Sequence, residues 1–144
     1  MHIEEHIRGK VERLIRMDQA GLHQMLGIEF QTVTRNVLIA TMPVNSRTVQ
    51  PMGFLHGGAS VALAETMISL GAILNIEAEG KTAVGLEINA NHVRSVAEGG
   101  LVTGTARPVH IGSTTQVWET RVTDESEKLI CISRGTLAIV DIRR

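Results

Sequence analysis

Aromatic residues are scarce in this sequence, whose 144 residues include two Phe, one Trp and no Tyr. The formal net charge is also close to neutral, at −1. Proteins that grip nucleic acid use a basic surface to neutralise phosphates and aromatic rings to stack on bases. Because this chain is poor in both, we do not expect nucleic acid among its partners.

Cysteine is almost absent as well, since Cys131 is the single one in the chain. It lies in the apolar run LICIS, where an inert buried thiol is the ordinary interpretation, and it has no second cysteine to pair with. Residues 1–20 mix acidic, basic and apolar positions and lack the continuous apolar core of a secretory signal. We therefore expect a cytoplasmic protein.

A stretch long and apolar enough for a membrane span occurs once, from Gly57 to Leu74. It carries Glu65, two Ser, one Thr and several small residues, and it lacks the basic flanks of a transmembrane helix. A buried core helix explains the stretch better. No membrane partner is therefore expected.

The overall composition is that of a folded domain, with 43% hydrophobic and 20% charged residues. A length of 144 residues suits one domain, and no linker or repeat divides the chain. Residues 1–144 are therefore predicted to form a single domain. Apolar positions within residues 1–26 have the spacing of one or two amphipathic helices, which we expect to cover the domain.

Strand-like segments lie on both sides of the apolar helix. The segments IEFQTVT and VLIATMPV flank Arg35-Asn36, a short polar break that suits a hairpin. After the helix come four more: KTAVGLEINANHV, LVTGTARPVHI, TTQVWETRVT and KLICISRGTLAIV. This grouping predicts an α+β fold with an antiparallel sheet of about six strands. A helix that is apolar on nearly all sides must be covered everywhere, so the sheet is expected to wrap around it.

Glu65 is the single charged residue of this helix. At helical spacing it shares a face with Val61 and Ser69, and no Lys or Arg lies within one turn to pair with it. Moving an unpaired carboxylate out of water costs several kcal/mol, so we interpret Glu65 as the working carboxylate of an active site. The alternative is a structural carboxylate that reaches solvent or meets an arginine from another strand.

The start of the helix is a second candidate feature. Gly57 and Gly58 leave room for a ligand near the backbone, and the unpaired N–H groups of a first helical turn suit an oxyanion. His56 and Gln50 could bring side-chain donors to the same place, although such residues in a loop are more often plain surface residues. His92, on the strand after the helix, is a further candidate.

Other chemistries fit the sequence poorly. The segment GASVA lacks the last glycine of a nucleophile elbow, and neither a G-x-G-x-x-G nor a Walker sequence occurs. The six histidines show no metal-ligand spacing. We therefore expect carboxylate-based chemistry with no metal and no cofactor.

The segment QPMGFLHGGASVALAETMISLGA resembles the hotdog-fold acyl-CoA thioesterases, in the branch of the 4-hydroxybenzoyl-CoA and enterobactin-proofreading thioesterases. The resemblance covers approximately Leu22 to Val140 and includes LGIEF, ATMPVNSRTVQP, VGLEINANHVR and HIGSTTQVWE. It implies a curved antiparallel sheet wrapped on one long helix. It also implies a homo-oligomer, a dimer or a tetramer, with the site between two subunits.

The resemblance also implies roles for single residues. Glu65 becomes the nucleophile or general base, and the Gly57 N–H and the Gln50 side chain polarise the thioester carbonyl. Positions that help to hold the thioester and water are His56, Ser69 and His92, and positions that contact the coenzyme A arm are Gly85 and Arg94. Ser113 and Thr114 are further candidates for contact with coenzyme A. They stand where many relatives carry a basic residue, which leaves an acyl-carrier-protein thioester open as the substrate.

Three functions remain to be distinguished. The first is a thioesterase for an aromatic or medium-sized acyl-CoA, in which coenzyme A is part of the substrate and no other cofactor is needed. The second is a hotdog enoyl-thioester hydratase or dehydratase, since those enzymes also combine a His with a helix carboxylate. The third is a non-catalytic acyl-CoA-binding protein. His56 directly before Gly57-Gly58, nine residues from Glu65, favours the thioesterase.

Overall fold

The computed structural model of this chain is built on one sheet of seven strands. Their order in the sheet is β1-β2-β3-β5-β6-β7-β4. The structure describes residues 1–17 and 21–142, the side chains of residues 15–17 excepted. The strands are β1 (His2–Ile3), β2 (Glu29–Val33), β3 (Leu38–Pro43), β4 (Lys81–His92), β5 (Leu101–Ile111), β6 (Thr115–Thr123) and β7 (Leu129–Asp141). The helices are the 3-10 turn η1 (Glu5–Ile7), α1 (Arg8–Met17), α2 (Leu22–Met25) and α3 (Gly57–Leu74).

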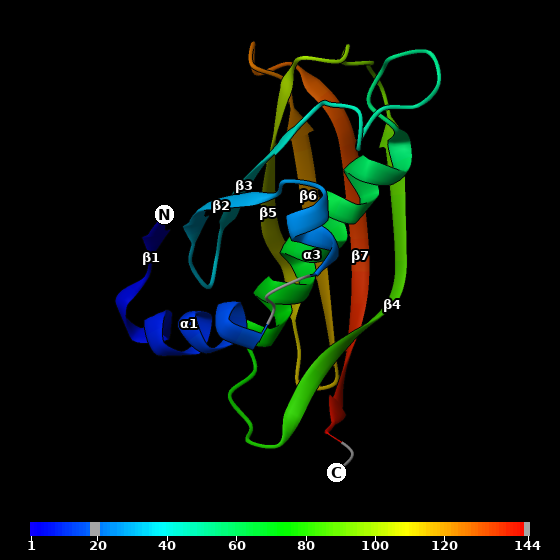
Figure 1. Cartoon of the computed structure of the whole chain (residues 1–144). Helices are drawn as coiled ribbons and strands as arrows, with labels where there is room; N and C mark the ends of the chain where they lie inside the picture. Colours follow the sequence, from blue (N-terminus) through cyan, green and yellow to red (C-terminus); the bar gives the residue numbers. More distant parts are fainter. Residues whose placement is uncertain (18–20, 143–144) are drawn as a thin grey trace.

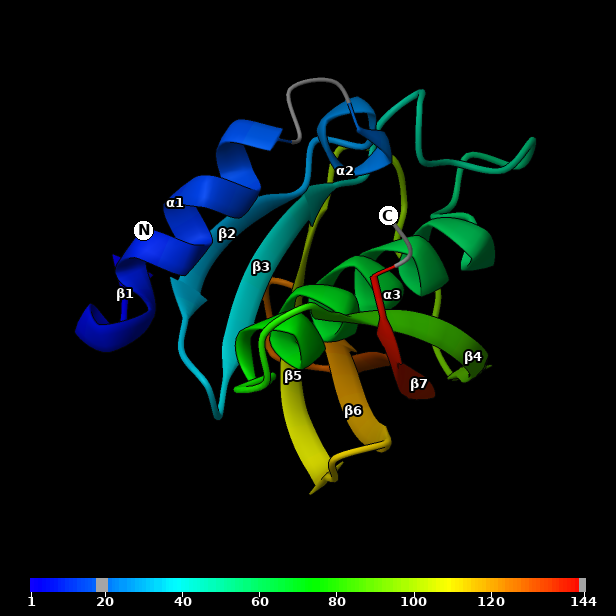
Figure 2. The same ribbon diagram turned by 90° about the horizontal axis from the view of Figure 1, so that it is seen from below.

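The sheet curves around α3, which crosses its concave face (Figure 1, Figure 2). Buried and more exposed positions alternate along β3 and β6, as a sheet with one wet face requires. The predicted α+β fold, a curved antiparallel sheet on one long helix, is confirmed. The seventh strand was not expected: β1 is two residues long and pairs in parallel with β2.

Strand β4 lies at the edge of the sheet although it follows α3 directly in the chain. It pairs antiparallel with β7, the last strand, and not with β5, the next one. A register shift between Gly85 and Glu87 marks a bulge in this pairing. The other side of β4 has no partner among the described residues.

Helix α3 is buried on one face only. Its buried residues recur every three or four positions, as in Ser60, Leu63, Met67 and Gly71. The opposite face is only partly covered, and Glu65 on it is exposed. The expectation that the whole helix would be covered is therefore wrong for a single chain.

The helix approaches the sheet closely because small residues stand at the contact. A Cβ atom added at Gly71 would lie 2.7 Å from the Trp118 ring, and one at Gly104 would lie 2.6 Å from Met67 Sδ. Trp118 itself is fully buried in β6, and its Nε1 donates to Gln116 Oε1 at 3.0 Å. Gln116 Nε2 in turn donates to the carbonyl of Ala72 at 3.3 Å, which ties β6 to the last turn of α3.

The N-terminal elements η1, α1 and α2 are helical, and residues 18–20 of the cover expected over residues 1–26 lie outside the described residues. Figure 2 shows α1 beside β2 and β3, and α2 on the side of α3 that the sheet leaves open. Ile7 and Val11 are buried in the core cluster. Lys10 Nζ donates to the carbonyl of Ile76, just beyond the end of α3, at 2.9 Å. The pKa of Lys10 is lowered, mainly because the side chain is partly buried.

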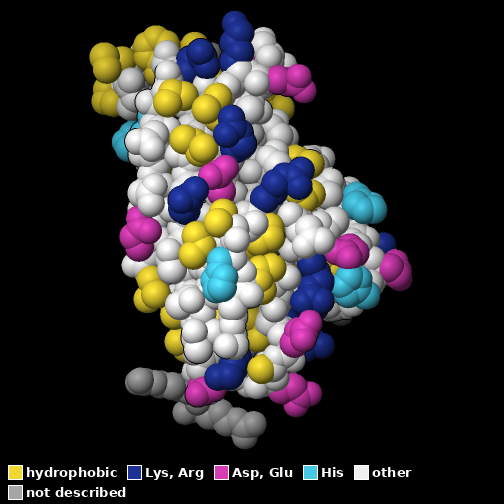
Figure 3. All heavy atoms as spheres, turned by 180° about the vertical axis from the view of Figure 1, so that it is seen from behind, with side chains coloured by type: hydrophobic (Ala, Val, Ile, Leu, Met, Phe, Trp, Pro, Cys, Tyr) yellow, Lys and Arg dark blue, Asp and Glu magenta, His cyan; other side chains and the backbone are white. Residues whose placement is uncertain are grey.

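Helix α3 is long and apolar enough to cross a membrane by length and composition alone, with a mean hydropathy of 1.5. Half of this stretch is buried inside the structure. Its buried face packs on the strands, so α3 is the core helix of the fold. The convex face of the sheet carries side chains of both charge signs among apolar ones (Figure 3).

We expect Gly71→Ala to lower the free energy of unfolding by about 1–3 kcal/mol, because the added methyl group would overlap the Trp118 ring. Gly9→Ala in α1 is the matched control, since nothing lies within 4 Å of the added Cβ. That variant should be up to about 1 kcal/mol more stable than the parent. Urea denaturation measures both, and equal free energies for the two variants would contradict the packing argument.

Candidate functional site

The first turn of α3 is capped by the imidazole that precedes it. His56 Nδ1 accepts a hydrogen bond from the Gly58 N–H at 2.8 Å, and the His56 carbonyl accepts from Ala59 N at 2.9 Å. The Gly57 N–H donates to no residue that the structure describes. One unpaired donor with the positive end of the helix dipole behind it is therefore available to a ligand.

Gln50 is oriented by a turn in the loop before the helix. Its Oε1 accepts from the Met52 N–H, and its carbonyl accepts from Gly53 N at 2.9 Å. Gly53 has a φ of 79°, a conformation that glycine adopts without strain. Because the amide oxygen is held in this way, the Nε2 group is the free donor of the Gln50 side chain.

His92 ends β4 and packs against the helix start. A Cβ added at Gly57 would lie 2.9 Å from His92 Nε2, so the imidazole occupies the space that any side chain at position 57 would need. This contact explains why a glycine stands at the first helical position. It also brings the end of the edge strand beside the unpaired N–H group.

These groups line one cavity of about 510 Å³. Gln50, Gly57 and His92 come from the loop, the helix and β4, and the other lining residues are Phe54, Leu55, Ser60, Val93, Arg94, Ser95 and Ile130. Arg94 NH1 donates to the Leu129 carbonyl at 2.6 Å, which holds the guanidinium at the rim. The cavity can bind a carbonyl oxygen between two neutral donors with a cation nearby.

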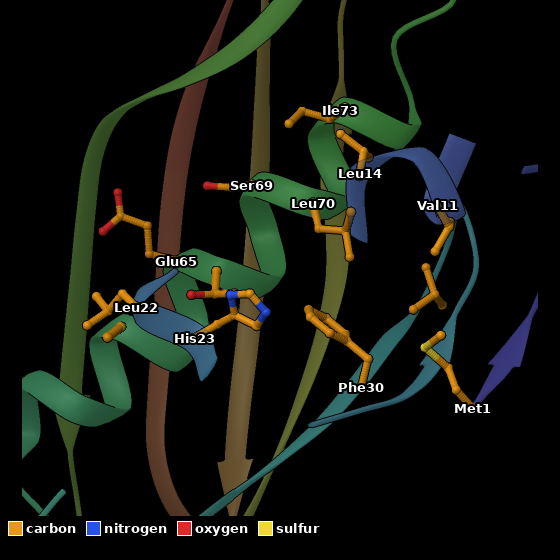
Figure 4. Close-up of a pocket in the computed structure, with 13 residues that line it drawn as sticks. Met1, Val11, Leu14, Leu22, His23, Phe30, Glu65, Ser69, Leu70 and Ile73 are labelled. Carbon is orange, nitrogen blue, oxygen red and sulfur yellow. The ribbon is translucent and has the colours of Figure 1, made fainter. Parts of the chain in front are cut away.

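Glu65 lies in a different cavity, of about 590 Å³, with Ser69 one turn further along the helix (Figure 4). Its carboxylate is exposed and makes no hydrogen bond or ion pair with any described residue. Glu65 Oε1 would lie 3.0 Å from a Cβ at Gly85, beside the bulge in β4. Bulges are frequent next to active sites because they redirect the strand.

A single chain therefore does not bring the candidate residues together. Gly57 and Glu65 are eight positions apart on one helix, which is about 12 Å along its axis. Glu65 does not lie beside the Gly57 N–H of its own chain, and the expected burial of its carboxylate is wrong within one chain. The chain presents two half-sites, one with the donors and one with the carboxylate.

The two residues assigned to the coenzyme A arm fall on different half-sites, Arg94 with the donors and Gly85 beside Glu65. Ser113 and Thr114 lie in the exposed turn between β5 and β6 and line neither cavity. Thr114 accepts from Ile139 N at 2.8 Å, so this turn is held to β7. Their contact with coenzyme A stays a prediction.

Sequence reasoning missed the apolar wall beside Glu65. Leu14, Leu22 and His23 from the N-terminal cover, with Phe30 from β2, line the same cavity as the carboxylate (Figure 4). Their spacing indicated a cover over the domain. The sequence carries no signal that this cover also forms a wall of the cavity, because that depends on how the cover packs against α3 and β2.

Two further features of the sequence have a place in the structure. Within residues 1–17 and 21–142, no group of three or more His, Cys, Asp and Glu is arranged to hold a metal ion. Cys131 is buried in β7, and burial raises the pKa of its thiol. The prediction of a buried thiol is confirmed.

The sequence profile of the thioesterase superfamily matches residues 52–131, which span α3, β4, β5, β6 and the start of β7. The chain belongs to the thioesterase superfamily. Its fold is the hotdog fold of that family, and the relatives of this chain include named thioester hydrolases. The chain is accordingly a thioester hydrolase.

Named relatives are similar to this chain in sequence over most of their length. The chain is 50% identical over 130 residues to the 1,4-dihydroxy-2-naphthoyl-CoA hydrolase of Escherichia coli, covering 90% of this chain and 94% of that protein. It is 48% identical over 124 residues to the protein of the same name in Listeria monocytogenes, covering 86% and 99%. A thioesterase of Haemophilus influenzae has a similar crystal structure, with a TM-score of 0.84, 47% identity and 92% of each chain covered.

The N-cap gives a prediction for this site. His56→Ala should lower the free energy of unfolding by about 1 kcal/mol, because the Gly58 N–H loses its acceptor. His56→Asn should retain most of this free energy, because asparagine is a favoured cap. Thermal and urea unfolding measure the effect.

Thioester hydrolysis by the same two variants separates capping from substrate contact. If His56 acts only as a cap, His56→Asn should restore hydrolysis together with stability. A stable but inactive Asn variant would assign the imidazole a direct contact with substrate. Wild-type stability of His56→Ala would refute the capping role.

Proposed function

We propose that the protein hydrolyses an aromatic or medium-sized acyl-CoA to the free acid and coenzyme A. The observation that carries this proposal is the Gly57 N–H at the start of α3, which donates to no described residue, with Gln50 in the lining of the same cavity. Two donors of this kind are what a thioester carbonyl needs when negative charge develops on its oxygen. The names of the relatives from Escherichia coli and Listeria monocytogenes support a CoA thioester as the substrate class.

In the proposed reaction, Glu65 takes a proton from a water molecule as the water oxygen attacks the thioester carbon. The charge on the carbonyl oxygen is accepted by the Gly57 N–H and Gln50 Nε2. When the C–S bond breaks, the proton held by Glu65 passes to the departing thiolate. Direct attack of the carboxylate on the carbon, followed by hydrolysis of the anhydride, is the other route open to Glu65.

The reaction requires a second copy of the chain, because the donors and the carboxylate are on separate half-sites. Edge strand β4 supports a dimer: it is long, its outer edge is unpaired among the described residues, and it exposes Val84 and Leu86. An exposed edge of this kind readily pairs with another strand. Antiparallel pairing of two copies of β4 would extend the sheet across a two-fold axis.

The positions along β4 suit such a dimer. Gly85 lies beside Glu65, and His92 lies beside Gly57. Antiparallel pairing centred between Ile88 and Asn89 would set Gly85 of one subunit opposite the partner's His92. Each carboxylate would then face the donors of the other subunit, which gives two complete sites per dimer. A tetramer would be a pair of these dimers.

Ser69 and His92 are assigned to positioning of the thioester and water, from opposite sides of the composite site. Arg94 and Gly85 would contact the coenzyme A arm, with Ser113 and Thr114 supplied from a neighbouring subunit. An acyl-carrier-protein thioester stays the second substrate, since the turn at Ser113 and Thr114 offers hydroxyl groups and no cation. We assign the reaction to the cytoplasm, where acyl-CoA is made and used.

Glu65→Ala should lower kcat for thiol release by about 100-fold or more, because no other carboxylate of the described residues lies in either cavity lining. The assay follows free thiol from benzoyl-CoA, hydroxyphenylacetyl-CoA and octanoyl-CoA. Glu125→Ala is the control, an exposed carboxylate in the turn after β6. Equal rates for Glu65→Ala and wild type would remove Glu65 from the mechanism. Hydration of the double bond of crotonyl-CoA by wild type, without thiol release, would favour the hydratase.

A mixing experiment tests the composite site. Gln50→Ala and Glu65→Ala should each be nearly inactive alone, because every site in either homodimer lacks one group. After unfolding and refolding together at equal amounts, about half of the dimers are mixed, and each mixed dimer has one intact site. The mixture should recover about a quarter of the wild-type activity. No recovery, with dimers present by sedimentation, would place both groups in one chain's site.

A further inference from the structure

Ser60 lies one turn after Gly57 on the same face of α3. It is 2% exposed, and it lines the cavity that also contains Gln50, Gly57 and His92. Helical side chains lean toward the N-terminal end of their helix, so the Ser60 hydroxyl is directed toward the first turn of α3. Figure 1 shows this turn beside the end of β4. A buried polar side chain therefore faces the cavity next to the free N–H group.

The Ser60 hydroxyl makes no hydrogen bond with any described residue. A serine inside a helix often donates to the carbonyl four positions earlier. That carbonyl belongs to His56, and it accepts from Ala59 N at 2.9 Å and from Ser60 N at 3.4 Å, but not from the Ser60 hydroxyl. A buried hydroxyl without a partner costs free energy on folding. Packing within the chain thus gives no reason for a serine at this position.

Three other buried hydroxyl groups of the chain differ from that of Ser60. Thr48 Oγ1 and Ser133 Oγ each donate to a backbone carbonyl at 2.9 Å. Thr120 Oγ1 is buried without a partner among the described residues, but Thr120 lines neither of the two cavities. Of these four residues, Ser60 alone combines an unpaired hydroxyl with a place in a cavity lining. Its missing partner is therefore sought in a ligand.

We propose that Ser60 is a further catalytic residue of thioester hydrolysis, whose hydroxyl donates a hydrogen bond to the sulfur of the substrate and stabilises the thiolate as it leaves. The proposal rests on the function proposed above and extends it. That function supplies donors for the carbonyl oxygen and a carboxylate for the attacking water, but it supplies no donor for the sulfur before the proton arrives.

The placement of Ser60 points to the sulfur. In the proposed reaction, the carbonyl oxygen is bound by the Gly57 N–H and Gln50 Nε2. Ser60 is three positions from Gly57, about 4.5 Å along the helix axis, so its hydroxyl falls beside the atoms bonded to the carbonyl carbon. Those atoms are the sulfur and a carbon of the acyl group. Of the two, only the sulfur accepts a hydrogen bond.

Arg94 supports the same assignment from the rim of this cavity. Its guanidinium is held there by the hydrogen bond to the Leu129 carbonyl. A cation at the rim suits phosphate groups, and the arm of coenzyme A that carries its phosphates begins at the sulfur. The cavity of Ser60 is therefore on the thiol side of the thioester. Leu55 and Ile130 in its lining are apolar, and a surrounding of low polarity strengthens a hydrogen bond.

The hydroxyl assists the reaction without giving up its hydrogen. The water oxygen bonds to the carbonyl carbon and its proton passes to Glu65; the C–S bond then breaks, and its electron pair goes to the sulfur. Ser60 donates to the sulfur while this charge develops, until the proton held by Glu65 reaches the thiolate. Because a hydrogen bond to a charged acceptor is stronger than one to a neutral acceptor, the transition state gains more than the bound substrate.

The test uses thioesters of one acyl group with four thiols: ethanethiol, 2-mercaptoethanol, methyl thioglycolate and trifluoroethanethiol. The pKa of the thiol falls along this series, so the leaving thiolate needs less and less stabilisation. The corresponding acyl-CoA is the fifth substrate. Thiol release gives kcat/KM for wild type, Ser60→Ala and Thr120→Val. The last variant is the matched control, since it removes an unpaired buried hydroxyl that lies outside both cavities.

Ser60→Ala should lower kcat/KM for the acyl-CoA about tenfold, as expected for one lost hydrogen bond to a charged group. The loss should be large for ethanethiol and nearly absent for trifluoroethanethiol, so the ratio of kcat/KM between these two substrates should fall about tenfold. Thr120→Val should keep the wild-type ratio. The melting temperature of Ser60→Ala should be no lower than that of wild type, because an unpaired buried hydroxyl is removed.

If Ser60→Ala fails to fold, as judged by its melting curve, Ser60→Cys takes its place, because a thiol is a weaker donor of similar size. Wild-type kinetics in the Ser60 variant would overturn the proposal. So would an equal loss for all four small thioesters, which would indicate a structural role, or a rise in KM confined to the acyl-CoA, which would place the hydroxyl on the rest of coenzyme A. No thiol release from any acyl-CoA by folded wild type would instead refute the proposed function.

Discussion

Close packing of α3 on the concave face of the sheet is the contact on which the rest of the structure depends. Gly71 lets the helix meet the Trp118 ring, and Gln116 ties the same strand to the last helical turn. With one face fixed in this way, every other side of α3 has a defined direction. The first turn points its free N–H toward the loop and β4, and Glu65 points to the side that the sheet does not cover.

The fold was largely predictable because its signals are local. Alternating apolar positions marked the six long strands, and a long apolar run marked α3, with bounds close to those observed. The order of strands was not predictable. β4 pairs with β7 across the whole second half of the chain, and nothing within either segment specifies that partner. The two-residue β1 is also too short to carry a pattern of its own.

The site was predictable as a set of residues but not as an arrangement. Gln50, Gly57 and His92 meet in one cavity, although they come from a loop, a helix and a strand. Glu65 was singled out because a buried charge is costly, yet in the single chain the carboxylate is exposed. The cost argument thus applies to a surface that a second subunit would have to cover. Sequence shows which residue is unusual, whereas the surroundings of that residue depend on the three-dimensional arrangement of distant segments.

The cap at the start of α3 also determines the chemical form of His56. Since Nδ1 accepts from the Gly58 N–H, that nitrogen must carry a lone pair, and the ring hydrogen of the neutral imidazole has to be on Nε2. The helix thereby selects one tautomer of its own capping residue. Whatever meets the outer edge of this ring encounters a hydrogen-bond donor. An ionised aspartate in the same place would cap the helix and present only acceptors.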